Sequence, residues 1–167
     1  MARMIESLIQ ELEQEAQTTR RVLERVPGDK LAWKPHDKSM SLGQLALHVA
    51  SVPGNVAEAS RQSPFEAPDF AHPSATSAAE LVPALDNSVA RAREILSSMD
   101  DAELGKMWRV VAGGKEVMAI PVGAMLRSIM LNHWYHHRGQ LLVYLRLLDV
   151  PVPSVYGPTA DENPFRQ

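Results

Sequence analysis

The chain has 167 residues, of which 45% are hydrophobic, and its 20 Asp and Glu against 17 Lys and Arg give a net charge of −3. This length suits a single packed domain, residues 1–167, and the scattered basic residues disfavour nucleic-acid binding, which needs a concentrated positive surface. The absence of cysteine excludes thiolate metal sites, thiol nucleophiles and disulfide bonds, so a metal site would have to use His, Asp or Glu.

Residues 3–25 predict an amphipathic first helix, which a proline and a glycine should end. Apolar side chains recur at helical spacing, at Ile5, Leu8, Leu12, Ala16 and Leu23. The segment is acidic where a signal peptide is basic and then apolar, and no apolar run approaches the roughly 18 residues of a membrane span. We therefore expect a cytoplasmic protein with no membrane segment.

A capping-box pattern, Ser41 with Gln44, predicts that a second helix begins after a short polar connection over residues 29–40. In that connection we expect Trp33 to anchor the loop to the core and His36 to be solvated. The buried stripe of the second helix is expected at Leu42, Leu45, Val49, Val52 and Val56.

His48 falls on the inward side of that stripe, three residues after Leu45 and four before Val52. A single inward histidine is ordinarily a core residue that hydrogen-bonds to a neighbouring backbone or hydroxyl group. Pro53 and Gly54 follow little more than one turn later and should kink or stop the helix.

The middle of the chain predicts a long loop and then a third helix. Residues 61–75 hold three prolines and no periodicity, so we expect a surface loop in which His72 is solvated. Ser77 with Glu80 makes a second capping box, and the helical stripe that follows it lies at Leu81, Leu85, Val89, Ala92 and Leu96.

A short hairpin and one long helix are predicted next. Residues 107–120 are rich in Val and fit two short strands joined by a two-residue turn at Gly113–Gly114. A proline opens the segment 121–148 and none recurs until Pro151, which predicts one uninterrupted helix roughly 40 Å long.

Three histidines lie at the middle of this long helix. His133 and His137 are four residues apart and point the same way along an apolar strip, whereas His136 is turned away from them by about 80°. Two imidazoles that face an apolar interior need partners, and a shared cation is one such partner. In a chain with six histidines such a pair also arises by chance roughly one time in five, so the pair alone does not establish a site.

The long helix is apolar on a second side as well, at Leu131, Trp134, Leu142 and Leu145. Such a helix is either the central helix of a bundle, or it packs its outer side against a second copy of the chain, which we favour. Gly139, inside the helix, suggests the close approach of another helix beside the histidines.

Four helices with one long crossover make an all-α four-helix bundle the most economical fold, with a short β-hairpin between the third and fourth helices. The proline-rich tail, residues 149–167, should be extended and run back along the bundle.

A few further side chains could support a site. Gln44 and Gln140 each lie one helical turn from an inward histidine and could orient an imidazole, while Arg138 is expected to be a solvated or ion-paired surface group. No Asp or Glu shares the histidine strip, although Asp86 of the third helix could approach it.

Four motifs together resemble the DinB (DinB/YfiT-like) family. These are W-K-P-H-x-K-S at 33–39, L-x-x-H ending at His48, H-x-x-x-H-R-G-Q at 133–140 and V-P-S-x-Y-G-P at 152–158. The resemblance runs from about residue 10 to about residue 162, and the three-histidine pattern with its R-G-Q extension is its most specific part.

The resemblance implies an up-down-down-up bundle, usually a homodimer, that holds a divalent metal ion through one histidine of the second helix and two of the fourth. In this sequence these are His48, His133 and His137, and His136 is left out. The ion would be zinc or nickel, with iron or manganese as further candidates.

Three imidazoles leave a coordination position open, as in catalytic zinc sites. The resemblance therefore implies a metal-dependent enzyme that acts on a small molecule, by thiol transfer of the bacillithiol or mycothiol type or by hydrolysis, although the substrate itself is not named by the sequence. The alternative is a non-catalytic, stress-related metal-binding or dimeric interaction protein.

Overall fold

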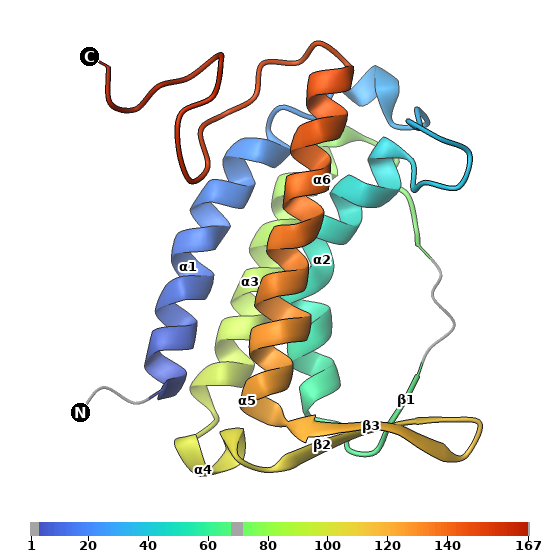
Figure 1. The fold of residues 1–167 in the computed structure, drawn as a ribbon, viewed down its shortest axis with the longest axis vertical. Coiled ribbons are helices and arrows are strands. Elements are labelled where there is room, and N and C mark those ends of the chain that lie inside the picture. The colour runs from blue at the N-terminus through green and yellow to red at the C-terminus, as the bar shows by residue number, and fades with distance from the viewer. Residues whose placement is uncertain (1–3, 68–71, 167) are drawn as a thin grey trace.

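The protein, described by a computed structural model over residues 4–67 and 72–166, is mostly helical with a small sheet at one end (Figure 1). Its helices are α1 (Met4–Leu23), α2 (Leu42–Ser60), α3 (Leu81–Ser97), α4 (Asp101–Leu104), α5 (Val122–Met125), η3 (Leu126–Asn132) and α6 (His133–Leu147), with 3-10 turns η1 (Gly28–Lys30) and η2 (Ala78–Glu80). The strands are β1 (Phe65–Glu66), β2 (Met107–Ala112) and β3 (Lys115–Pro121).

The long helices lie side by side around a common apolar core. In Figure 1, α1 and the last helical segment run upward, whereas α2 and α3 run downward, so the chain has to return from the lower end of α2 to the upper end of α3. Each long helix contributes fully buried side chains to the core, for example Leu12, Leu45, Leu85, Leu96, Trp134 and Leu145. Within the described residues, no helix is both long enough and apolar enough to cross a membrane.

The predicted helix starts are confirmed at the atomic level. The Ser41 hydroxyl accepts from the Gln44 amide at 3.2 Å, and the Ser41 amide donates to the Gln44 side chain at 2.8 Å. The second predicted capping box, Ser77 with Glu80, is also present and opens η2, which leads directly into α3. Trp33 packs against the core as expected, with its ring edge-on to Tyr144.

The predicted hairpin is confirmed as β2 and β3, and Gly113 and Gly114 both have positive φ, 56° and 77°, as the turn requires. Trp108 fixes the hairpin to the end of α2, because its indole donates to the Ala59 carbonyl at 3.0 Å. The all-α expectation is corrected by a third strand, β1, which pairs with β2 in parallel. A strand of two residues is too short to produce a periodic pattern in the sequence.

The last helical segment is continuous, but residues 126–132 have π-helical hydrogen bonding, which the sequence did not predict. Leu126, Met130 and Leu131 are all fully buried. On an α-helix Leu131 would be turned about 140° from Leu126, whereas a π-helix, with about 4.4 residues per turn, brings all three onto one face. The wider turn therefore lets neighbouring apolar residues enter the same core.

The second apolar strip of this helix is buried inside the chain. Leu131, Trp134 and Leu145 are fully buried, and Leu142 is partly buried. Of the two arrangements that the sequence left open, the structure has the first: the helix is central among the long helices. This strip is not an outer face for a second copy of the chain. Gly139, by contrast, is exposed, and a Cβ atom there would have no neighbour within 4 Å, so the close approach predicted at this glycine does not occur within the chain.

Pro53 does not stop α2, which continues to Ser60. Proline has no amide hydrogen, so the carbonyl four residues earlier, that of Val49, loses its helical donor. The Trp134 indole of α6 donates to this carbonyl at 2.7 Å in a buried environment. The helix therefore continues because a neighbouring helix supplies the hydrogen bond that proline removes.

Gly54 allows α3 to approach α2 closely at the next residue. A Cβ atom on Gly54 would lie 2.9 Å from the Ser88 carbonyl oxygen, too close for any other residue. The Gly54 amide donates to the Ser88 hydroxyl at 2.8 Å, and this hydroxyl donates to the Ser51 carbonyl at 3.1 Å. The Pro-Gly pair thus joins α2 to α6 on one side and to α3 on the other.

The tail after α6 has no regular structure and lies across the end of α1 (Figure 1). Arg138 anchors it and is 1% exposed, so the predicted surface position of this arginine is wrong. Its guanidinium contacts the Glu15 carboxylate at 2.6 Å and donates to the Tyr156 hydroxyl of the tail at 2.6 Å. The charge is buried because a carboxylate and a phenol meet it there.

We expect Trp134→Phe to destabilise the protein by about 1–3 kcal/mol, because it leaves the buried Val49 carbonyl without a donor. Pro53→Ala restores an amide donor four residues after Val49, so the same change should cost less in a Pro53→Ala background. Urea unfolding of the wild type, both single variants and the double variant gives this coupling energy. Equal costs in the two backgrounds would contradict the role assigned to the Trp134 hydrogen bond.

Candidate metal centre

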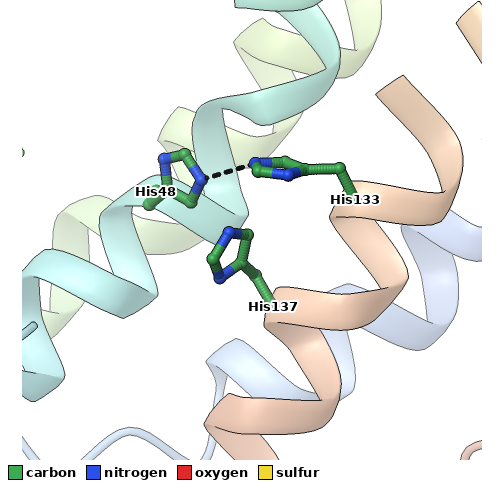
Figure 2. A group of neighbouring side chains, drawn as sticks. All are labelled: His48, His133 and His137. Atoms are coloured by element: carbon green, nitrogen blue, oxygen red, sulfur yellow. Dashed lines mark hydrogen bonds between the residues drawn. The ribbon is translucent and has the colours of Figure 1, made fainter. Parts of the chain in front are cut away.

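Three histidine side chains from two helices converge in the space between those helices (Figure 2). His48 comes from α2, and His133 and His137 come from the first two turns of α6. One ring nitrogen from each lies within 4.8 Å of the other two, and the Nε2 atoms of His48 and His133 are 3.1 Å apart. All three side chains are half-buried. The structure thus brings together the three residues singled out from the sequence.

The hydrogen bond between α2 and α6 explains why these rings meet. It joins Val49 to Trp134, which are the residues directly after His48 and His133. This hydrogen bond sets the position of α2 along α6, and at that position the two histidines face each other at the same level. His137 follows one turn later on the same side of α6.

Gln140 orients the third imidazole, as the sequence suggested. Its side-chain oxygen lies 2.7 Å from Nδ1 of His137. An amide oxygen can only accept, so Nδ1 carries the proton and the lone pair of His137 is on Nε2. Such a contact is the usual way in which a protein fixes the tautomer of a metal-binding histidine.

Burial keeps the three imidazoles neutral. Desolvation, with the neighbouring histidines adding to it, lowers the pKa of His48 to about 4. Desolvation also lowers the pKa of His137 to about 4, although the Gln140 contact opposes the shift, and it lowers the pKa of His133. At neutral pH the cluster therefore offers lone pairs rather than positive charge.

The donor set fits a divalent cation. Two nitrogens bound to one tetrahedral zinc at about 2.0–2.1 Å lie roughly 3.3 Å apart, close to the 3.1 Å between His48 and His133. Within residues 4–67 and 72–166, this is the one group of three or more His, Asp or Glu side chains with donors so close together, and no carboxylate takes part in it. An ion held there would keep its full double charge.

The remaining candidates lie apart from this group. His136 is exposed, with its ring 5.0 Å from that of His137, and the ring of His36 accepts from the Lys38 amide in an exposed loop. Asp86 forms an ion pair with Arg20 between α1 and α3, so it does not supply the carboxylate that the sequence left open.

His72 is the residue near this site that the sequence reasoning missed. It is exposed, as predicted, but its ring is 5.5 Å from that of His48 and perpendicular to it. A pocket of about 120 Å³ opens between them and is lined by Leu47, His48, Ser51, Asn55, His72 and Pro73. The irregular loop gave no signal of this contact, because it depends on the loop returning along α2.

Comparison with known proteins agrees with the motifs. The model of the DinB family matches residues 1–164. The uncharacterised protein YrdA of Bacillus subtilis is 26% identical over 163 residues, which cover 97% of this chain and 93% of YrdA.

Two solved structures share the fold. A DinB-like protein from Bacillus cereus superposes with a TM-score of 0.72 at 24% identity, covering 93% of this chain and all of that one. The DinB-like protein YjoA of Bacillus subtilis has a TM-score of 0.66 at 18% identity, with coverage of 89% and 96%.

We expect the metal-free protein to lose stability as the pH falls from about 6.5 to about 4. In this range an unfolded histidine takes up a proton, whereas His48 and His137 in the folded cluster do not, so protons favour the unfolded chain. His137→Gln should reduce this loss, as measured by urea unfolding in EDTA at several pH values.

His36→Gln, in the exposed loop, is the matched control and should leave the pH dependence of unfolding unchanged. A His137→Gln variant with the same pH dependence as the wild type would contradict the assignment of neutral imidazoles to the cluster.

Proposed function

The chain belongs to the DinB family, and we propose that it binds one divalent metal ion through His48, His133 and His137 and acts on a small molecule at a coordination position left open. The observation that carries this proposal is the convergence of three neutral imidazoles from two helices, with no carboxylate among them. When bound, the ion would act as a Lewis acid that lowers the pKa of a water or thiol.

Thiol transfer is the reaction class we favour over hydrolysis. Hydrolysis ordinarily needs a general base within hydrogen-bond reach of the attacking water. Among residues 4–67 and 72–166, the group of donors around the proposed ion contains histidines alone, and Asp86 is held by Arg20 elsewhere. A thiol has a pKa of about 8.5 in water, against about 15.7 for water itself, so on the metal it would release its proton to solvent more easily and would depend less on a positioned base, which suits a site of neutral side chains.

The roles of the chain's own residues follow from their contacts. Gln140 holds His137 in the tautomer that presents Nε2, and the α2–α6 hydrogen bond holds His48 opposite His133. Zinc and nickel are the ions we expect first, because three imidazoles suit both, with iron or manganese also accepted by such a set.

We also infer that the fold is an up-down-down-up four-helix bundle and that residues 1–167 form one domain. The directions of the long helices in Figure 1 and the family match over residues 1–164 support this inference.

A homodimer through the outer face of α6 is a further part of the proposal. Val143 and Leu147 are apolar yet 59% and 58% exposed, and they lie on one strip with His136 and Gly139. The space over Gly139 is open, and a helical glycine costs about 1 kcal/mol relative to alanine. A second α6 packed on this strip would account for both features.

Purified protein loaded with zinc or nickel should hold one ion per chain, as measured by metal analysis after dialysis. His48→Ala, His133→Ala and His137→Ala should each lose it, and Gln140→Leu should weaken binding about 10–100-fold because the imidazole loses its orienting partner. His136→Ala, outside the donor set, is the control that keeps the ion.

Retention of stoichiometric metal by all three alanine variants would overturn the site. A bound ion that accepts no small molecule at an open coordination position would instead favour the alternative, a non-catalytic, stress-related metal-binding or interaction protein.

Val143→Asp should convert the proposed dimer to a monomer, because it places a charge in an apolar contact. Sedimentation equilibrium measures this, and Val117→Asp, on the exposed strand β3, is the matched control that should leave the dimer intact. A wild-type protein that is monomeric at every concentration would refute the interface.

A further inference from the structure

The pocket beside His48 has a lining whose polar part consists of imidazole, hydroxyl and amide groups. Its volume is about 120 Å³, and its polar side chains are the imidazoles of His48 and His72, the hydroxyl of Ser51 and the amide of Asn55. No Lys, Arg, Asp or Glu among the described residues lines it. The pocket's own side chains therefore offer hydrogen bonds rather than an ion pair to a group that enters it, which suits a neutral polar group.

The size of the pocket limits what enters it. At about 30 Å³ for each water in the liquid, it has room for roughly four waters, well below the 300–1,000 Å³ of sites that enclose a drug-sized ligand. It can therefore take the reactive end of a substrate, a few atoms long, while the remainder stays in solvent.

The first turn of α2 fixes the loop that carries His72. The side-chain amide of Gln44 donates to the His72 carbonyl at 2.9 Å, and the Ala75 amide donates to the Gly43 carbonyl at 3.2 Å. A Cβ atom on Gly43 would lie 2.6 Å from the Ser74 hydroxyl and 3.2 Å from the Leu31 carbonyl oxygen, so the absence of a side chain favours this close packing. His48 lies one turn after Gln44, so the loop held by Gln44 places the ring of His72 5.5 Å from that of His48.

His72 stands outside the group of metal donors. In the part of the chain that the structure describes, the ring nitrogens that lie within 4.8 Å of one another belong to His48, His133 and His137. His72 instead lines the pocket together with His48, with its ring 5.5 Å from that of His48, so it can contact a molecule that occupies the pocket.

We propose that His72 is a specificity-determining residue. It hydrogen-bonds a neutral polar group next to the donor atom of a metal-bound ligand, so this inference rests on the proposed metal site. The imidazole can serve either as donor or as acceptor, so a hydroxyl or an amide on the ligand satisfies it. Gln44 is the positioning residue, because it holds the His72 backbone in place.

The test uses cobalt-loaded protein and two pairs of simple thiols as probes. 2-Mercaptoethanol and 3-mercaptopropanol carry a hydroxyl, and ethanethiol and propanethiol are their matched controls without it. The sulfur-to-cobalt absorption band measures the binding of each thiol. We expect the wild type to bind at least one hydroxylated thiol about tenfold more tightly than its control, as one hydrogen bond allows.

His72→Ala should remove this preference while cobalt affinity and the binding of the plain thiols stay within about threefold, and His72→Gln should restore part of it. Gln44→Glu keeps the capping-box acceptor for the Ser41 amide but loses the donor to the His72 carbonyl. It should therefore lower the preference for the hydroxyl without loss of folding stability.

The outcomes separate this inference from the proposed function. A wild-type protein that takes up no stoichiometric cobalt overturns both. If cobalt binds, three results overturn the role of His72 alone: no hydroxyl preference in the wild type, an unchanged preference in His72→Ala, or a roughly 100-fold loss of cobalt affinity in His72→Ala, which would make it a metal ligand.

Discussion

The hydrogen bond from the Trp134 indole to the Val49 carbonyl is the contact on which the candidate site depends. It exists because Pro53 removes the helical donor of that carbonyl, and a buried carbonyl without a donor is costly. The residue before each partner is a histidine, His48 on one helix and His133 on the other. Pro53, a residue type that ordinarily ends a helix, thus leaves free the carbonyl whose hydrogen bond sets the register between α2 and α6.

The last helix places uncharged histidines on one side and a buried charged arginine on another. Toward α2 it presents His133 and His137, which burial keeps uncharged. Toward α1 it presents Arg138, whose charge is buried against Glu15 and the hydroxyl of Tyr156. Consecutive residues on a helix differ by about 100° in direction. The positive charge next in sequence to His137 is therefore turned away from the cluster and neutralised where it lies, which leaves the histidine side free to accept a cation.

The long connection between α2 and α3 is a consequence of their shared direction. Two neighbouring helices that run the same way need a chain segment that returns along their length. Here this segment passes the first turn of α2, where Gly43 and Gln44 hold it, and so places His72 beside His48. The same topology that separates α2 from α3 in the sequence also supplies His72 to the lining of the pocket.

Much of this protein follows from short stretches of its sequence. The capping box at Ser41 and Gln44, the turn at Gly113–Gly114 and the pair His133 and His137 are each set by residues a few positions apart, so local chemistry was enough to predict them. The inward direction of His48 followed in the same way from the apolar stripe of its own helix.

Only the tertiary structure decided how these pieces meet. The π-helical turn forms so that Leu126 and Leu131 enter one core, and Arg138 is buried because Glu15, more than a hundred residues away, lies opposite it. The contact between His48 and His72 likewise depends on the return path of a loop without periodicity. Such contacts join residues that are distant in the chain, and packing between whole helices selects them, whereas spacing along the sequence reports only the direction of each side chain on its own element.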